Sequence, residues 1–326
     1  MTRPAYAMSK AREGRVEQAL FRGANLTLAN PAYSRSARSL LNALLEEDVG
    51  SGDLTVRALE MDGKKAIAEV KAREAGVIAG LEEYGMLLRQ RGIEVGFLRR
   101  DGEMVQPGET VLHAEGDRGD LLALERTGLN LLQRMSGIAT ASRSLQERVR
   151  ASGAAARIIG TRKTLWGLLD KRALHLGSGG THRLGLNDAI LIKNNHLALL
   201  AGREEEAAPL AIEKAWKMRK EAAFIEVEVR GAEAARVAAQ AFQRLQEADS
   251  GACPCLILLD NMTPEQAGEI VALLRREGLW DSALLEASGG ISESNAQAYA
   301  DTGVDALSIG ALTHSARALD LSQRIS

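Results

Sequence analysis

The 326-residue chain is poor in aromatic residues, which make up 3% of it. Proteins that bind single-stranded nucleic acid stack the bases on aromatic side chains, so this composition disfavours that class. An excess of charge of one sign is also missing, because 41 Lys and Arg residues stand against 43 Asp and Glu residues. The overall charge therefore does not indicate nucleic acid or an anionic membrane as a partner, and any polyanion has to be met by a local group of cations.

The chain also lacks the apolar run of about 18–20 residues that a membrane-spanning helix needs. The first 30 residues have no continuous apolar segment of the kind found in a secretory signal, and we expect residues 1–34 to form a loosely ordered extension. Cysteine is scarce, and Cys253 and Cys255 are separated by one residue, which is neither a zinc spacing nor an easy disulfide. These absences predict a reduced, cytoplasmic protein.

From about residue 156 the sequence alternates between short apolar segments typical of strands and longer amphipathic segments typical of helices. The predicted strands are Ala156–Ile159, Ala189–Ile192, Phe224–Val229, Cys255–Leu259, Leu284–Ala287 and Ala306–Ile309. The predicted helices between them include Glu233–Glu247, Pro264–Glu277 and Ser292–Ala300. Nearly continuous apolar strands that alternate with helices indicate a parallel sheet covered by helices, and the number of units favours a closed α/β barrel over an open sheet.

The part of the chain before residue 156 has a different pattern. Between about residues 55 and 115, short strand-like pieces alternate with Gly and Pro, which indicates a small α/β layer. The spacing of apolar residues from Leu121 to Met135 then predicts a long, mostly buried helix.

Polar residues follow the predicted strands at their carboxyl ends. In an α/β barrel these ends meet on one face, where active sites are built. The predicted cationic residues at this face are Arg162, Lys163, His182, Arg183 and Lys193. Cations placed close together repel one another, so the group requires anions such as carboxylates or phosphates, although any single Lys or Arg could be a solvated surface charge.

Acidic residues and glycines complete the predicted face. Glu228 lies in an apolar strand and Asp260 ends the next one, so the two carboxylates could hold Mg²⁺, with an ion pair to a neighbouring cation as the alternative for Glu228. Ser288, Gly289 and Gly290 follow one strand and Gly310 follows the last, where exposed backbone N–H groups can bind a phosphate. The chain has neither a P-loop nor a Rossmann glycine motif, which disfavours nucleoside triphosphates and dinucleotides.

The ordered series of these motifs resembles the quinolinate phosphoribosyltransferase family, also called carboxylating nicotinate-nucleotide pyrophosphorylases. The matching motifs extend from about residue 37 to 326. They are Glu47–Thr55, Glu125–Asn130, Ser136–Thr140, Thr161–Thr164, His182–Leu186, Leu191–His196, Leu259–Met262, Glu286–Gly290 and Gly303–Ser315.

This resemblance implies an N-terminal open α/β sandwich and a C-terminal incomplete α/β barrel. The implied boundaries are a sandwich over residues 35–128, a barrel over 129–314 and a tail over 315–326 that returns to the sandwich. It also implies a Mg²⁺-dependent homodimer that transfers phosphoribose from phosphoribosyl pyrophosphate to quinolinate and releases CO₂, forming nicotinate mononucleotide for NAD synthesis.

The resemblance also implies roles for individual residues. Arg126 reaches into the partner's site, while Arg162, Lys163, His182, Arg183 and Lys193 hold quinolinate and phosphate groups. Glu228 and Asp260 flank the ribose and the metal, with Lys163 as the third catalytic residue. Ser288, Gly289, Gly290 and Gly310 bind the ribose 5-phosphate.

The chain departs from the family pattern at Leu165, Trp166 and Asn194, which leaves the acceptor specificity open. Two alternatives also stay open from the sequence. One is a related pyrophosphorylase-like protein associated with molybdenum transport, which Lys193 argues against. The other is a non-catalytic ligand sensor on the same fold, which Glu228 and Asp260 argue against.

Overall fold

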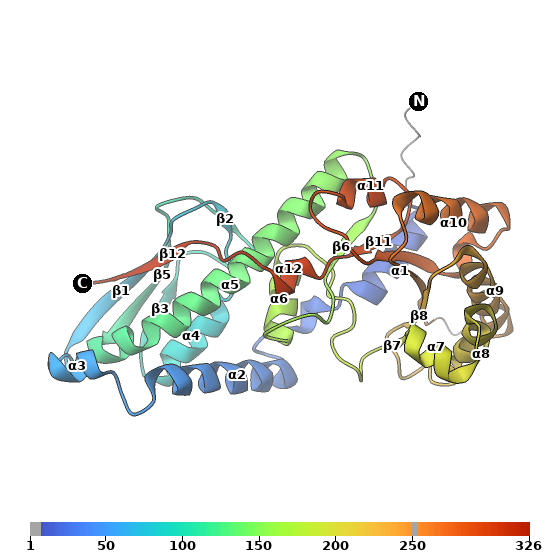
Figure 1. Cartoon of the computed structure of the whole chain (residues 1–326). Helices are drawn as coiled ribbons and strands as arrows, with labels where there is room; N and C mark the ends of the chain where they lie inside the picture. Colours follow the sequence, from blue (N-terminus) through green and yellow to red (C-terminus); the bar gives the residue numbers. More distant parts are fainter. Residues whose placement is uncertain (1–7, 250–252) are drawn as a thin grey trace. The chain divides into compact units, whose positions relative to one another are not determined.

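The computed structural model describes residues 8–249 and 253–326 (Figure 1). The chain divides into two compact units, and the unit that holds the parallel sheet is called the barrel unit here. It comprises residues 8–22, 144–163 and 179–311, of which 250–252 lie outside the described part. The sandwich unit comprises residues 23–143, 164–178 and 312–326. Within the described residues no helix is long and apolar enough to cross a membrane.

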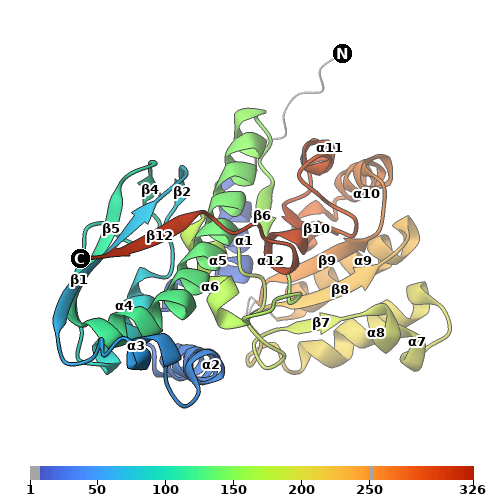
Figure 2. The ribbon, with the colours of Figure 1, turned by 60° about the vertical axis from the view of Figure 1, so that its left-hand side comes forward.

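The barrel unit contains a six-stranded parallel sheet in the order β6-β11-β10-β9-β8-β7. Its strands are β6 (Arg157–Ile159), β7 (Ile190–Ile192), β8 (Ile225–Val229), β9 (Cys255–Asp260), β10 (Leu284–Ser288) and β11 (Ala306–Ser308). Its helical elements are α1 (Lys10–Leu20), α7 (Asn194–Leu200), α8 (Glu204–Trp216), α9 (Ala232–Ala248), α10 (Pro264–Arg276), η2 (Trp280–Ser282) and α11 (Ala296–Ala300). Figure 2 shows β8 and β9 side by side, with α8 and α9 along them.

The barrel is incomplete. β7 pairs with β8 alone, and β6 is extended on its free side by a single parallel bridge between Ile159 and Gly180. The closed barrel that the strand count favours is therefore wrong, and the incomplete α/β barrel of the family resemblance is confirmed. The reason is local, because the segment from Gly180 to residue 189 forms no strand where a further one would close the sheet.

The sandwich unit is built on an antiparallel sheet in the order β12-β1-β5-β3. Its strands are β1 (Lys65–Ala72), β3 (Glu94–Phe97), β5 (Thr110–Asp117) and β12 (Leu321–Ile325), and β2 (Gly76–Val77) pairs with β4 (Met104–Val105). Its helical elements are η1 (Gly23–Asn25), α2 (Pro31–Val49), α3 (Leu54–Ala58), α4 (Leu81–Gln90), α6 (Leu168–Leu176), and most of α5 (Arg118–Ala151) and α12 (Ala311–His314).

One face of this sheet is buried and the other is open. Along β1, Ala68, Val70 and Ala72 are fully buried, whereas Ile67, directly before Ala68, is 46% exposed. Helices α2, α4 and α5 lie together on one side of the sheet (Figures 1 and 2). The alternation of buried and exposed residues is that of an open α/β sandwich. The C-terminal residues join the sheet, because β12 runs antiparallel to β1.

The boundaries between the units differ from those expected at residues 128/129 and 314/315. α5 continues without a break from the sandwich unit into the barrel unit, which begins again at Ser144. Residues 164–178, which carry α6, group with the sandwich unit although they lie between two segments of the barrel. A single uninterrupted helix gives no sequence signal for a boundary inside it, and this explains the difference.

The expectation of a loose extension was wrong for residues 10–34, while residues 1–7 lie outside the described part. Ser9 begins α1 by accepting a hydrogen bond from the Arg12 N–H. Val16, Ala19 and Leu20 on this helix are fully buried and form one core cluster with the first residues of the barrel strands, among them Leu256, Leu284 and Ala306. α1 therefore covers the amino-terminal end of the barrel.

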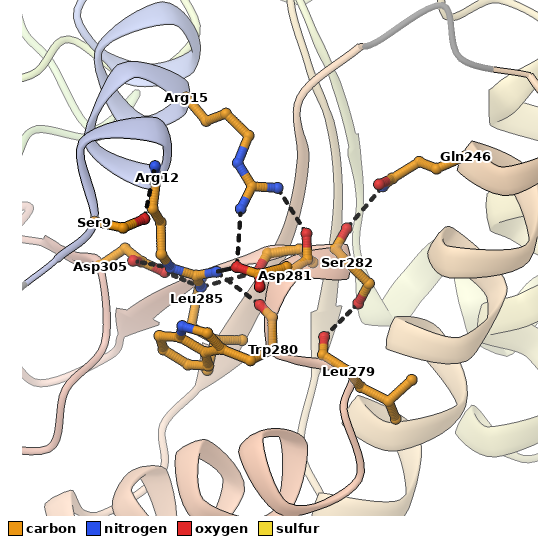
Figure 3. A network of polar contacts seen from close by, with 11 residues as sticks. Ser9, Arg12, Arg15, Gln246, Leu279, Trp280, Asp281, Ser282, Leu285 and Asp305 are labelled. Atoms are coloured by element: carbon orange, nitrogen blue, oxygen red, sulfur yellow. Dashed lines mark hydrogen bonds and ion pairs between the residues drawn. The ribbon is translucent and has the colours of Figure 1, made fainter.

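A buried arginine fixes α1 in this place (Figure 3). The Arg12 guanidinium donates to both carboxylate oxygens of Asp305 at 2.6 Å, and to the carbonyl oxygens of Trp280 and Ala283 at 2.6 and 2.9 Å. Its carbon lies 3.7 Å from the centre of a Trp280 ring. The Arg12 and Asp305 side chains are each only 2% exposed, so the charges compensate one another away from water.

Replacing Arg12 by alanine should lower the free energy of unfolding by about 3–5 kcal/mol, because Asp305 would keep a buried charge without its partner. Urea denaturation followed by far-UV circular dichroism measures this loss. Arg15→Ala is the matched control, since its partner Asp281 is 85% exposed and such pairs contribute less than about 1 kcal/mol. Equal losses in the two variants would contradict the assignment of Arg12 as the residue that holds α1.

Candidate active site

The predicted site residues of the barrel unit lie at one edge of its sheet. All neighbouring strands of this sheet are parallel, so their carboxyl ends share an edge. Residues in the strands' last positions or directly beyond them are Arg162, Lys163, Lys193, Glu228, Asp260, Ser288, Gly289, Gly290 and Gly310. The sheet register thus places nine of the twelve predicted residues along this edge. His182 and Arg183 come from the segment after Gly180, and Arg126 belongs to the sandwich unit.

Arg183 is a buried cation with few partners. Its side chain is 6% exposed, its Nη1 donates to the Ala189 carbonyl oxygen at 3.4 Å, and its Nε has no hydrogen-bond partner in the described part of the chain. Burial and the nearby charge of Arg162 both lower the pKa of Arg183, in that order of size. Two arginines in mutual repulsion, one of them with unused donors, form a site prepared for an anion such as a carboxylate.

The Arg183 segment is held by the N-terminal part of the chain. The Leu20 carbonyl oxygen, at the end of α1, accepts hydrogen bonds from the backbone N–H groups of Thr181 and His182, at 2.8 and 3.0 Å. Arg22 forms an ion pair with Asp188 at 2.9 Å, and the Asp188 carboxylate in turn accepts from the Leu184 N–H at 2.8 Å. The residues expected to be loosely ordered therefore support the predicted anion site.

Glu228 and Asp260 form an acidic group with Asn194. The Asn194 N–H donates to Glu228 Oε1 at 3.5 Å, and its side-chain amide donates to Asp260 Oδ2 at 3.4 Å. Burial, followed by the charge of Asp260, raises the pKa of Glu228. Arg230, which is 62% exposed, pairs with Asp260 at 3.3 Å.

The acidic group fits a magnesium ion. Mg²⁺ takes oxygen ligands, usually one or two carboxylates completed by water and substrate phosphates. Glu228 and Asp260 supply two carboxylates, and the Asn194 Oδ1 atom is buried with no hydrogen-bond partner among the described residues. An ion pair with a neighbouring cation was the alternative for Glu228. Its carboxylate lies beside Asp260 and Asn194 instead.

The glycines after β10 form a turn with left-handed backbone. Gly289 and Gly290 have φ values of +96° and +62°. A Cβ atom on Gly289 would lie 2.3 Å from Asn261 Oδ1, so only glycine fits there, whereas a Cβ on Gly290 would meet nothing within 4 Å. The turn is thus packed on one side and open on the other, as a backbone phosphate site requires.

His182 lies inside the barrel. It is 5% exposed, and its Nδ1 accepts a hydrogen bond from the Arg183 backbone N–H at 2.7 Å. Its Nε2 lies 3.0 Å from Glu226 Oε2 and 3.5 Å from Glu286 Oε2. Both ring nitrogens are therefore engaged by protein groups, and this geometry does not support the prediction that His182 contacts the substrate directly.

Glu226 and Glu286 were not predicted as site residues. Glu226 is fully buried and Glu286 is 1% exposed. Burial raises the pKa of both groups, and the Glu226 charge raises the pKa of Glu286 further. The available signal is a carboxylate within an apolar strand, which Glu226 and Glu286 share with Glu228.

The remaining predicted features lie in the sandwich unit. Arg126 is an exposed residue of α5. Leu165 and Trp166, which depart from the family pattern, are anchored through their N–H groups to Asp170 Oδ2 at 3.0 and 3.1 Å. Asp170 is fully buried and also pairs with Arg134 at 2.8 Å. The altered loop therefore has a defined shape of its own.

An anion site of arginines, an acidic pair and a glycine turn at the carboxyl edge of an incomplete barrel define a phosphoribosyltransferase of the barrel type. Comparison with known proteins gives the family. Residues 53–136 match the N-terminal domain of quinolinate phosphoribosyl transferase and residues 138–324 match its C-terminal domain. The chain belongs to the quinolinate phosphoribosyltransferase family, as its motifs predicted.

Relatives from several organisms agree with this. The chain is 40% identical over 291 residues to a probable carboxylating nicotinate-nucleotide pyrophosphorylase of Methanothermobacter thermautotrophicus, covering 88% of this chain and 98% of that one. It is 38% identical over 295 residues to the corresponding protein of Mycobacterium leprae, with 88% and 96% covered. The solved nicotinate-nucleotide pyrophosphorylase of Francisella tularensis is similar with a TM-score of 0.76 at 30% identity, covering 90% of this chain and 96% of that one.

The buried glutamates should make stability depend on pH. A raised pKa means that the folded protein retains protons that the unfolded chain releases, so the free energy of unfolding should fall as pH rises between the ordinary value of 4.5 and about 8. Each retained proton contributes at most about 1.4 kcal/mol per pH unit. Urea denaturation at several pH values measures the slope, and Glu286→Gln should reduce it.

Glu265→Gln is the control for this measurement, because Glu265 is exposed and its pKa is lowered rather than raised. Its slope should equal that of the unaltered protein. An unchanged slope in the Glu286→Gln protein would show that the buried pair does not hold the extra proton.

Proposed function

We propose that the protein transfers the phosphoribosyl group of phosphoribosyl pyrophosphate to the ring nitrogen of quinolinate and decarboxylates the product to nicotinate mononucleotide. The observation that carries this is the buried Arg183 guanidinium, whose Nε has no hydrogen-bond partner among the described residues. It lies near Arg162, at the same sheet edge as Glu228 and Asp260. The relatives named above carry this activity in their names. The step belongs to NAD synthesis.

The cations at the edge bind the acceptor and the leaving group. Arg162 and Arg183 present planar donor pairs that match carboxylates, and Lys163 and Lys193 act as single charges toward a carboxylate or phosphate. Burial and Asp260 raise the pKa of Glu228, and the Lys193 charge opposes this rise, which places the lysine within electrostatic reach of the acidic group. Quinolinate and pyrophosphate are both multiply charged anions, which the repulsion between the arginines requires.

The acidic pair stabilises the reacting sugar. As the bond from C1 of ribose to pyrophosphate breaks, positive charge develops on C1, and fixed carboxylates close to that atom lower its energy. We assign this role to Glu228 and Asp260. Mg²⁺ held by these carboxylates and the Asn194 amide oxygen would neutralise charge on the departing pyrophosphate.

The glycine turn binds the 5-phosphate. Backbone N–H groups of Gly289 and Gly290, with the Ser288 side chain and Gly310 after β11, can approach the phosphate closely because no Cβ atom occupies the open side of Gly290. This anchor fixes C1 relative to the carboxylates.

Decarboxylation needs no separate cofactor. Once the C1–N bond has formed, the ring is a pyridinium, and the bond from C2 to its carboxylate can break with the electron pair left at C2. The adjacent positive nitrogen stabilises this pair until a proton replaces CO₂. The protein contributes by holding the two carboxylates with Arg162 and Arg183.

The assembly we propose is a cytoplasmic homodimer in which Arg126 enters the partner's site. The exposure of Arg126 on α5 supports this. Two free buried cysteines, Cys253 and Cys255, agree with a reducing compartment. The related protein associated with molybdenum transport gains no support, since the relatives named above are all pyrophosphorylases.

The activity is tested by incubating the purified protein with phosphoribosyl pyrophosphate, Mg²⁺ and, separately, quinolinate, nicotinate or nicotinamide. Quinolinate alone should give nicotinate mononucleotide and an equal amount of CO₂, and chelation of Mg²⁺ should abolish the product. Arg162→Ala and Lys193→Ala should each lower kcat/KM more than about tenfold, since a substrate anion loses a partner. Lys214→Ala on α8 is the control and should retain full activity. Product from nicotinate, or none from quinolinate, would refute the proposal.

The shared site is tested by mixing two inactive variants, Arg126→Ala and Lys163→Ala. If Arg126 serves the partner's site, random exchange of subunits should restore about a quarter of the activity, because half the dimers are mixed and each has one intact site. The measurement is the quinolinate assay before and after subunit exchange. No recovery in exchanged dimers would place Arg126 in its own subunit's site.

A further inference from the structure

The cluster of His182, Glu226 and Glu286 is the group of buried titratable side chains that the proposed reaction leaves without a role. Its three ligand atoms lie within 4.8 Å of one another, and all three side chains are buried. Glu226 and Glu286 come from β8 and β10, the two neighbours of β9. Burying a carboxyl group in an apolar interior costs free energy unless a partner compensates it. Two such groups at one place therefore call for an explanation.

The hydrogen bonds fix the state of the cluster. Since His182 Nδ1 accepts from the Arg183 N–H at 2.7 Å, the ring proton lies on Nε2, which faces Glu226 at 3.0 Å. The same Nε2 atom lies 3.5 Å from Glu286 Oε2, so both carboxyl groups flank the protonated side of the ring. The imidazole is thereby held as one tautomer in one orientation.

The backbone at His182 needs this support. Its φ of +54° lies in the left-handed region, which is strained for a residue other than glycine. The Phe224 ring meets the imidazole edge-on at 5.3 Å, and the His182 N–H is tied to Leu20. The strained residue directly precedes Arg183, so the orientation of the imidazole determines where the next backbone N–H and its side chain lie.

We propose that Glu226 and Glu286 form a positioning pair that holds His182, and through it Arg183, in the geometry that receives a carboxylate of the substrate. This inference rests on the proposed function. Neither glutamate touches the substrate. The pair acts from beneath the site, through the imidazole, in the way that outer-shell carboxylates orient histidines elsewhere.

The test is a double-mutant cycle with Glu226→Gln and His182→Asn in the full chain. Glutamine preserves the shape of Glu226, and asparagine tolerates the left-handed backbone while losing the reach to Glu226. Each variant should raise KM for quinolinate about tenfold or more, with KM for phosphoribosyl pyrophosphate changed less than about threefold. The double variant should lose no more than the worse single variant, because both act through the same contact.

Glu83→Gln is the matched control, because Glu83 is an equally buried carboxylate in the sandwich unit, where it lies 2.8 Å from the Arg172 guanidinium. It should lower stability and leave both KM values unchanged. Independent, multiplicative losses in the cycle would overturn the proposal, as would Glu226→Gln with a normal KM for quinolinate. If Glu226→Gln does not fold, Glu286→Gln takes its place in the cycle.

A second measurement does not depend on activity. ¹⁵N spectra of histidine-labelled protein, with His182→Asn used to assign the resonance among the five histidines, should show one unprotonated and one protonated nitrogen for His182. Elemental analysis of the same sample should find no stoichiometric metal that depends on His182. A doubly protonated ring or a bound metal at the cluster would overturn the proposal, even if the quinolinate reaction is as proposed. If the spectra show the expected tautomer but the protein does not use quinolinate, the proposed function is refuted and the positioning pair is not.

Discussion

Parallel pairing throughout the six-stranded sheet is the constraint on which the site depends. Because β6 to β11 all run in one direction, residues separated by more than a hundred positions in the chain reach a common edge. An antiparallel neighbour at any position would send its strand end to the opposite side. This direction alone brings the arginines, the acidic pair and the glycine turn to one edge. The orientation of each side chain has to be fixed by other contacts.

Orientation is supplied from the other end of the barrel. α1 covers the amino-terminal ends of the strands, and Arg12 fixes it through Asp305. The last carbonyl of the same helix then receives the N–H groups of Thr181 and His182. A segment with no residue in the reaction thus supports the loop that carries Arg183, because an open barrel leaves that loop without a neighbouring strand on its outer side.

The strands and their polar ends were predictable because both signals are local. Apolar runs such as Cys255–Leu259 appear as β9, and Asp260 follows at its end. The place of α1 was not predictable, because Arg12 and Asp305 are 293 residues apart in the chain. A single arginine in a charged segment is typical of a surface residue. The His182 cluster was missed for the same reason, since its three members come from a loop and two strands whose adjacency only the sheet order reveals.

Asn194 shows how one residue sets the charge of the acidic group. An aspartate here would add a third carboxylate beside Glu228 and Asp260, although burial and then the charge of Asp260 already raise the pKa of Glu228. The amide instead donates to Asp260 and its backbone N–H donates to Glu228, so it joins the two carboxylates without adding charge. The cations facing them, Lys193 and the exposed Arg230, then balance two negative charges rather than three. Asn194 therefore joins the two carboxylates and leaves their negative field weaker than an aspartate would.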